Sequence, residues 1–180
     1  MKKLIYIEEN FISPDECQKF IDLSLLNKDN EMPYGDESRG GDTYLTTVDW
    51  KNYGAVYYGG DVNTTVPSLD HEVVTRVNSI CKNFDSSANL DYVGVVRWPV
   101  GTFMKPHIDD NNVHKPDVFA AMLYLNDNFT GGSTCFENFE VKPEVGKLIV
   151  FSNSQYLHYV SKVEGDERFV LSFWYNSLNK

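Results

Sequence analysis

The sequence predicts a mainly β domain of the α+β class, in which N-terminal helices support an antiparallel β-sandwich. Its 180 residues suffice for one domain with its own core. Two stretches with helical periodicity precede residue 91, and six segments rich in branched and aromatic residues follow it. Short turn sequences separate those six segments, which is typical of neighbouring antiparallel strands. We therefore predict a single domain over 1–180, with helical support and long loops in 1–90 and a β-strand core in 91–176.

The composition argues against several kinds of protein. Apolar residues make up 42% of the chain and aromatic residues 14%, as expected for a folded protein. The net charge of -10 argues against a nucleic-acid partner, because phosphate backbones need a basic surface. No apolar run is long enough for a membrane span or a signal peptide. Cys17, Cys81 and Cys135 form no CxxC motif, so we expect buried, reduced thiols in a cytoplasmic protein.

The first half of the chain is predicted to contribute one strand and two helices. A strand at Leu4–Glu8 precedes the capping box Ser13–Glu16, which has proline at the first helical position. The apolar face expected for this helix consists of Cys17, Phe20, Ile21, Ser24 and Leu25. Ser68 or Asp70 can cap the second helix, and its expected apolar face consists of Val73, Val74, Val77, Ile80, Cys81 and Phe84.

The segment between the helices, residues 31–60, combines glycines with six tyrosine and tryptophan residues. We expect short strands at 43–48 and 55–58 within loops. Two interpretations stay open for the aromatic residues. They form a lid over a substrate site, or they cover the outer edge of the sheet.

Strands dominate the second half. The predicted strands are Tyr92–Trp98, Val118–Asn126, Ser133–Phe136, Lys147–Phe151, His158–Val163 and Arg168–Asn176. In the last strand, Phe169, Leu171 and Phe173 form one face, while Arg168 and Ser172 lie on the other. A charge within a buried strand is costly unless it is paired. Arg168 is therefore a candidate for binding a ligand carboxylate in bidentate fashion.

His107 and Asp109 are candidate metal ligands, because residues two apart on a strand point to the same side. His158 opens a later strand that can lie alongside. Two histidines and one carboxylate form the facial triad of non-haem Fe(II) oxygenases, which leaves coordination positions open. Asp110 is an alternative ligand, but the strand alternation favours Asp109. Tyr124, on the face of Ala120 and Met122, is a candidate second donor to the carboxylate that Arg168 would bind.

Residues 95–176 resemble the 2-oxoglutarate- and Fe(II)-dependent dioxygenases, most closely the prolyl 4-hydroxylase-like branch. The matching positions are Gly101, His107, Asp109, Tyr124, Gly131–Thr134, Pro143, Gly146, His158 and Arg168–Trp174, and Asn10–Cys17 resembles the start of the family's first helix. The resemblance implies a double-stranded β-helix, or jelly roll. It further implies that His107, Asp109 and His158 bind Fe(II) and carry the catalysis. Arg168, assisted by Tyr124 and Ser172, would bind 2-oxoglutarate, and Trp174 would form a wall of the pocket.

The implied cofactors are Fe(II), 2-oxoglutarate and dioxygen, with ascorbate as a further candidate. Two positions depart from the family pattern. Trp98 stands where a tyrosine is usual, which removes a phenol near the iron, and Arg168 stands where the collagen-type members carry lysine.

The resemblance and the aromatic-rich loops predict hydroxylation of a prolyl residue in a peptide or protein partner, because aromatic grooves suit extended proline-rich segments. Free proline or another small molecule is the alternative substrate. Two alternatives come from other classes. Zinc accepts the same three ligands, so a zinc hydrolase is one, although it leaves Arg168 unexplained. A jelly-roll binding module without turnover is the other.

Overall fold

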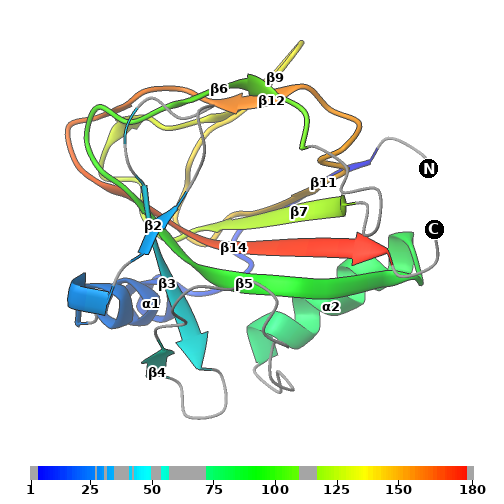
Figure 1. The fold of residues 1–180 in the computed structure, drawn as a ribbon, viewed down its shortest axis with the longest axis horizontal. Helices are drawn as coiled ribbons and strands as arrows, with labels where there is room; N and C mark the ends of the chain where they lie inside the picture. Colours follow the sequence, from blue (N-terminus) through cyan, green and yellow to red (C-terminus); the bar gives the residue numbers. More distant parts are fainter. Residues whose placement is uncertain are drawn as a thin grey trace.

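The computed structural model describes residues 4–26, 28–30, 32–34, 41, 43–49, 54–56, 72–109 and 117–177. Within these residues the protein has three layers (Figure 1). Helices α1 (Pro14–Leu26) and α2 (Glu72–Phe84) cover one face of a large sheet, and a small sheet lies over the other face. The short 3-10 helix η1 (Lys28–Asn30) follows α1. The prediction of a mainly β fold with supporting helices is confirmed.

The large sheet has eight strands. Its order is β1 (Ile5–Glu8), β11 (Leu148–Phe151), β7 (Asp117–Tyr124), β14 (Arg168–Ser177), β5 (Ala88–Trp98), β3 (Thr43–Asp49) and β2 (Met32–Tyr34), and β4 (Gly54–Val56) pairs with β3. The small sheet has the order β10 (Glu140–Val141), β9 (Thr134–Phe136), β12 (His158–Val160) and β6 (Met104–His107). A separate pair consists of β8 (Thr130–Gly131) and β13 (Val163–Glu164).

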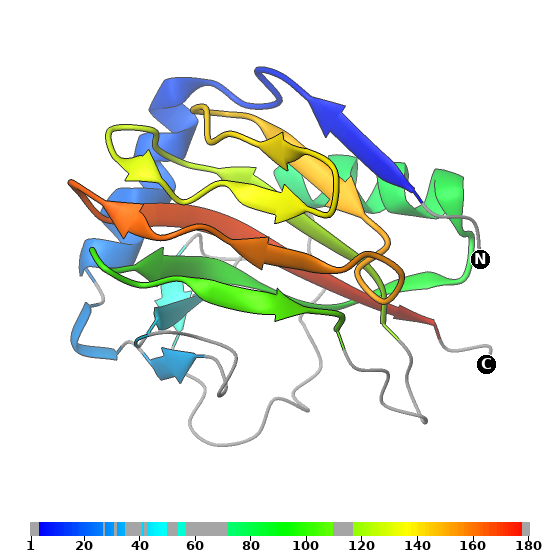
Figure 2. The same cartoon turned by 90° about the horizontal axis from the view of Figure 1, so that it is seen from above.

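From β5 onward the chain winds back and forth between the two main sheets (Figure 2). It passes from β5 in the large sheet to β6 in the small one, and then from β7 to β9, from β11 to β12 and finally to β14. All pairings in both sheets are antiparallel. This winding is that of a double-stranded β-helix, and the predicted jelly roll is confirmed.

The predicted alternation along β14 is present, and it divides the core in two. Phe169, Leu171 and Phe173 pack in a cluster with the helices, whereas Val170 belongs to a second cluster between the sheets. The apolar residues of α1 and α2 complete the first cluster, which fixes the large sheet on its helical support. The second cluster surrounds the candidate site.

The first helix begins as predicted, since the Glu16 amide donates a 3.2 Å hydrogen bond to Ser13 Oγ. The predicted apolar faces are wrong at one residue in each helix. Leu25 is 44% exposed, because Cys17, Phe20, Ile21 and Ser24 already fill the buried stripe of α1. Phe84 is 46% exposed because it is the last residue of α2, where its ring lies 6.0 Å from that of Tyr6. Ser68 and Asp70 lie outside the described residues.

Two predicted strands end earlier than expected. The segment predicted as one strand, His158–Val163, divides into β12 and β13, because Val163 changes partner and pairs with Gly131. The strand predicted to reach Asn126 ends at Tyr124, because the Asn126 side chain takes over the pairing and accepts a 2.8 Å hydrogen bond from the Phe169 amide. Most of the aromatic-rich segment 31–60, for which a lid and an edge cover both stayed open, lies outside the described residues.

Candidate metal centre

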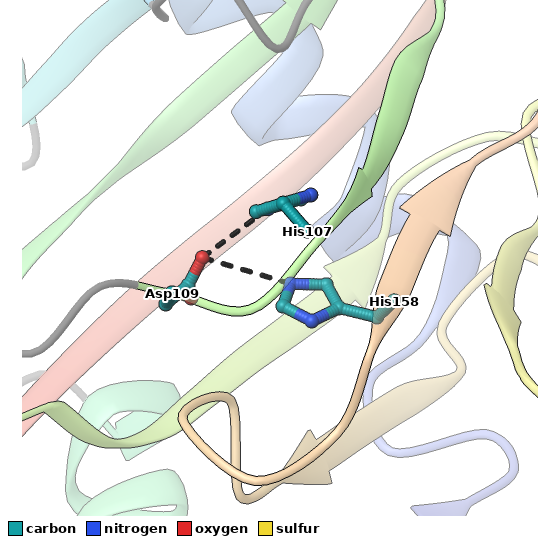
Figure 3. A group of neighbouring side chains, drawn as sticks. All are labelled: His107, Asp109 and His158. Atoms are coloured by element: carbon teal, nitrogen blue, oxygen red, sulfur yellow. Dashed lines mark ion pairs between the residues drawn. The ribbon is translucent and has the colours of Figure 1, made fainter.

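Three side chains from two neighbouring strands and one loop converge at one end of the small sheet (Figure 3). His107 ends β6 and His158 begins β12, and the two residues are direct register partners. Asp109 lies on the loop that follows β6. Its Oδ1 atom is 3.2 Å from Nε2 of His107 and 3.7 Å from Nε2 of His158. All three candidate ligand atoms lie within 4.8 Å of one another.

The second nitrogen of each imidazole is fixed by the backbone. Nδ1 of His107 lies 2.8 Å from the carbonyl oxygen of Lys105, and Nδ1 of His158 lies 2.8 Å from that of Tyr156. A carbonyl oxygen only accepts hydrogen bonds, so Nδ1 carries the proton in both rings. Each Nε2 therefore directs its lone pair toward the shared point beside Asp109, which is the arrangement of metal-binding histidines.

The charge states of the triad suit a cation. Burial raises the pKa of Asp109, but its contacts with the His107, His158 and Asn153 side chains together outweigh this effect, so the pKa lies below its usual value. Burial lowers the pKa of His158, against the opposing attraction of Asp109. At neutral pH these shifts favour an ionised carboxylate and a neutral imidazole, the forms in which both groups bind metals.

A cavity of about 430 Å³ opens between the two sheets beside the triad. Ligand sites in proteins usually fall within 300–1,000 Å³ or so and have mostly apolar walls. The lining residues include the three triad members and two further predicted residues, Ser172 and Trp174. Apolar side chains from both sheets form most of the remaining wall, and they are Val96, Trp98, Met104, Ala120, Met122, Phe151, Val160 and Val170.

Arg168 and Tyr124 lie next to this cavity but are not among its lining residues. Arg168 is completely buried, and its guanidinium carbon is 4.9 Å from the centre of the Trp98 ring. The Tyr124 hydroxyl lies 2.5 Å from Thr134 Oγ1. Trp98 and Thr134 both line the cavity, so each predicted cosubstrate residue contacts a residue of the wall.

Residues 93–176 match the family model of the 2OG-Fe(II) oxygenase superfamily. The matched residues include the whole triad. The match supports an oxidoreductase of the dioxygenase type and favours this class over the zinc hydrolase and the binding module. No curated protein matches the chain in sequence.

Solved structures of prolyl hydroxylases share the fold of this oxygenase. A viral collagen prolyl hydroxylase from Paramecium bursaria Chlorella virus-1, in complex with 2OG, aligns with a TM-score of 0.66 and 20% identity, covering 96% of both chains. A Pseudomonas putida prolyl-4-hydroxylase gives 0.65 and 16%, covering 96% of this chain and 92% of its own. A Trichoplax adhaerens prolyl hydroxylase in complex with a hypoxia inducible factor peptide gives 0.69 and 16%, covering 96% and 83%.

The donor set of this oxygenase fits the Fe(II) that the matched superfamily implies. Two imidazoles and one carboxylate are the protein ligands of non-haem Fe(II) oxygenases. Adjacent ligands at about 2.1 Å from a metal lie roughly 3 Å apart, close to the 3.2 and 3.7 Å that separate Oδ1 from the two Nε2 atoms. The side chains therefore need only small movements to share one ion.

Two residues of the site were missed at the sequence level as functional candidates. Thr134 contacts the Tyr124 hydroxyl, and Asn153 donates a 2.7 Å hydrogen bond to Asp109 Oδ2. Asn153 follows the strongly apolar strand Leu148–Phe151, and a polar residue at the end of a buried strand is a signal that could have found it.

Proposed function

We propose that this dioxygenase hydroxylates prolyl residues in a peptide or protein substrate, with Fe(II) bound by His107, Asp109 and His158. The observation that carries the proposal is the position of one carboxylate oxygen within 3.2 and 3.7 Å of two imidazole nitrogens. When bound, Fe(II) and 2-oxoglutarate supply oxidation by dioxygen, in which one oxygen atom enters a substrate C–H bond while 2-oxoglutarate becomes succinate and carbon dioxide.

The protein's own contribution is to position these groups and exclude water. Three ligands on one side of a bound ion would leave its other side accessible from the cavity. Fixing Nδ1 of both histidines on backbone carbonyls prevents ring rotation, so the two Nε2 atoms keep their direction. The apolar wall limits the water that can compete with substrate.

Arg168 is the proposed partner of the distal 2-oxoglutarate carboxylate. Its charge is completely buried between the Trp98 and Tyr124 rings, with its guanidinium carbon 4.9 and 5.4 Å from the ring centres. A guanidinium is well suited to bind a carboxylate, because its planar group can donate two parallel hydrogen bonds. Ser172 adds a hydroxyl that lines the cavity on the same face of β14, and the Tyr124 ring lies next to the Arg168 guanidinium.

Two features support a proline ring as the substrate group. The cavity wall is mainly apolar and includes the indoles of Trp98 and Trp174, which suit a saturated ring without charge. In addition, the structures of similar fold include a collagen prolyl hydroxylase and a prolyl hydroxylase bound to a peptide.

The test is turnover with Fe(II) and 2-oxoglutarate across proline-containing peptides and free proline, with and without ascorbate as a candidate reductant. Succinate and the mass of the amino-acid product are measured together. We expect succinate in equal amount to a peptide that has gained one oxygen atom. Oxygen gain on free proline alone would replace the peptide by the small molecule, and absence of succinate with every substrate would contradict the oxygenase reaction.

We further propose a cytoplasmic location. The three cysteines are buried and free, which suits a reducing compartment. Among the described residues no helix is long and apolar enough to cross a membrane. Fractionation of the producing cells, with the protein followed by antibody, tests the location.

A further inference from the structure

We infer that Asn153 is a positioning residue that holds Asp109 as a one-oxygen ligand of the metal. This inference rests on the proposed metal site of His107, Asp109 and His158. Asn153 lies just after β11 in the large sheet, whereas the loop that carries Asp109 follows β6 in the small sheet. The contact between them therefore connects the two sheets at the metal site.

Two hydrogen bonds join the residues. The Asn153 side-chain amide donates to Asp109 Oδ2 over 2.7 Å, and the Asp109 backbone amide donates to the Asn153 carbonyl oxygen over 3.3 Å. The backbone contact sets the position of the loop, and the side-chain contact sets the rotation of the carboxylate. Because Nδ2 occupies Oδ2, the other oxygen, Oδ1, is the one that faces both histidines.

The side-chain oxygen of Asn153 is buried without a hydrogen-bond partner among the described residues, which indicates that the fold alone does not require an asparagine here. Asn153 is 0% exposed, and its Oδ1 atom has no hydrogen-bond partner among the described residues. A buried polar atom without a partner destabilises a protein, and an apolar side chain of similar volume would avoid that cost. The only side-chain hydrogen bond of Asn153 in the described structure is the one to Asp109, so its benefit lies at the metal site.

A carboxylate fixed in this way uses one coordination position instead of two. If Oδ2 were free, the carboxylate could rotate and bind the ion through both oxygens, occupying a position needed by 2-oxoglutarate or dioxygen. Asn153 thus acts on the metal through Asp109, in the manner of residues that orient metal ligands. Loss of such residues typically weakens metal binding about 10- to 100-fold.

The test compares Asn153→Leu and Asn153→Ser with Ser152→Ala. Ser152 is the adjacent buried residue, and its hydroxyl accepts a 3.1 Å hydrogen bond from the Leu4 amide, away from the metal site. Metal affinity is measured by calorimetry with Mn(II) alone, and the ligand field is measured from the visible absorption of the Co(II)-loaded protein. Thermal unfolding of the metal-free protein monitors the fold.

We expect both Asn153 variants to bind Mn(II) about 10-fold or more weakly and to show an altered Co(II) spectrum. Asn153→Leu should keep the unfolding midpoint of the metal-free protein close to that of the wild type. Ser152→Ala should keep wild-type Mn(II) affinity and spectrum. Wild-type affinity and spectrum in both Asn153 variants would overturn the inference, as would equal weakening by Ser152→Ala. Failure of the wild-type protein itself to bind Mn(II), or unchanged binding in His107→Ala, would instead contradict the metal site.

Discussion

Trp98 and Arg168 face each other as register partners on β5 and β14, and the guanidinium carbon of Arg168 lies 4.9 Å from the centre of the Trp98 ring. The Tyr124 ring lies on the guanidinium at 5.4 Å, so two aromatic faces hold the buried cation. Cation–π attraction stabilises a guanidinium in such a position, and it is strongest for tryptophan. Trp98, which stands where the related family usually has tyrosine, therefore fixes the direction of Arg168 while also lining the cavity.

Replacement of Arg168 by lysine tests its predicted role in binding 2-oxoglutarate. Lysine keeps the charge but lacks the planar group that forms two parallel hydrogen bonds. Loss of one charge-assisted hydrogen bond costs roughly 1.5–3 kcal/mol. We therefore expect the half-saturating concentration of 2-oxoglutarate to rise about 10- to 100-fold, measured from succinate formation.

Arg97→Lys is the matched control for this change. Arg97 is also buried in β5, but its partner is Glu167, at 2.6 Å. This variant should lose some stability and keep the wild-type requirement for 2-oxoglutarate. An equal rise for both variants would indicate a general effect of lost packing.

Gly132→Ala should disturb the Arg168 side chain through a direct steric contact. A Cβ atom at Gly132 would lie 2.9 Å from Arg168 Cδ and 2.6 Å from a ring carbon of Phe129. The φ angle of +63° adds strain of about 1–2 kcal/mol for any residue other than glycine. We expect lower stability together with a higher half-saturating 2-oxoglutarate concentration, measured by thermal unfolding and by succinate formation.

Gly165→Ala separates strain from the steric contact. Gly165 also has a positive φ, of 87°, but a Cβ atom there would meet nothing within 4 Å. This control should lose stability by about the strain alone, roughly 1–2 kcal/mol, and keep the wild-type response to 2-oxoglutarate. If it also changed that response, strain in the loop rather than contact with Arg168 would explain both results.

His107→Ala should abolish specific metal binding. The variant removes one of three donors, so we expect Mn(II) affinity to fall by more than about 100-fold. Lys105→Ala is the control, because Lys105 is exposed on the same strand and its carbonyl oxygen, which fixes the His107 ring, is kept. The Mn(II) affinity of both variants is measured by calorimetry, and Lys105→Ala should keep the wild-type value. Retained affinity in His107→Ala would exclude His107 as a ligand.

Much of this fold could be predicted because it follows local rules. The alternation of Phe169, Val170, Leu171 and Ser172 marks two opposite faces of a strand, and those faces pack in the two separate clusters. The capping box at Ser13 fixes a helix start independently of the rest of the chain. The exposure of Leu25 could not be predicted, because it depends on how wide a stripe of α1 the sheet covers.

The candidate site was predictable for a different reason. His107 and His158 face each other only because β6 and β12 pair, and spacing alone does not specify that register. The resemblance to a known family supplied it. Asn153 and Thr134 escaped prediction because each acts through a contact with a distant residue, Asp109 or Tyr124, and only the folded structure brings these pairs together.

The buried thiols predict a loss of stability in mildly alkaline solution. Burial raises the pKa of Cys17 to about 11 and that of Cys81 to about 12, from 9.0 in both cases. Below pH 9 both the folded and the unfolded chain hold these protons, so the free energy of unfolding is unaffected. Between pH 9 and the folded pKa values, the unfolded chain releases these protons while the folded chain keeps them. The free energy of unfolding therefore falls as the pH rises through this range. Each thiol should therefore lower the free energy of unfolding by roughly 1 kcal/mol by pH 10.

Cys81→Ala isolates one of these contributions. Its free energy of unfolding, measured by urea at pH 7 and pH 10, should start lower than that of the wild type because a buried side chain is truncated. The decrease between the two pH values should then be smaller than in the wild type by roughly 1 kcal/mol, since one titrating thiol is gone. Cys135→Ala retains both of the other thiols, Cys17 and Cys81, and should lose more stability over this range than Cys81→Ala does. An unchanged decrease in Cys81→Ala would mean that Cys81 ionises equally easily in the folded and unfolded chains.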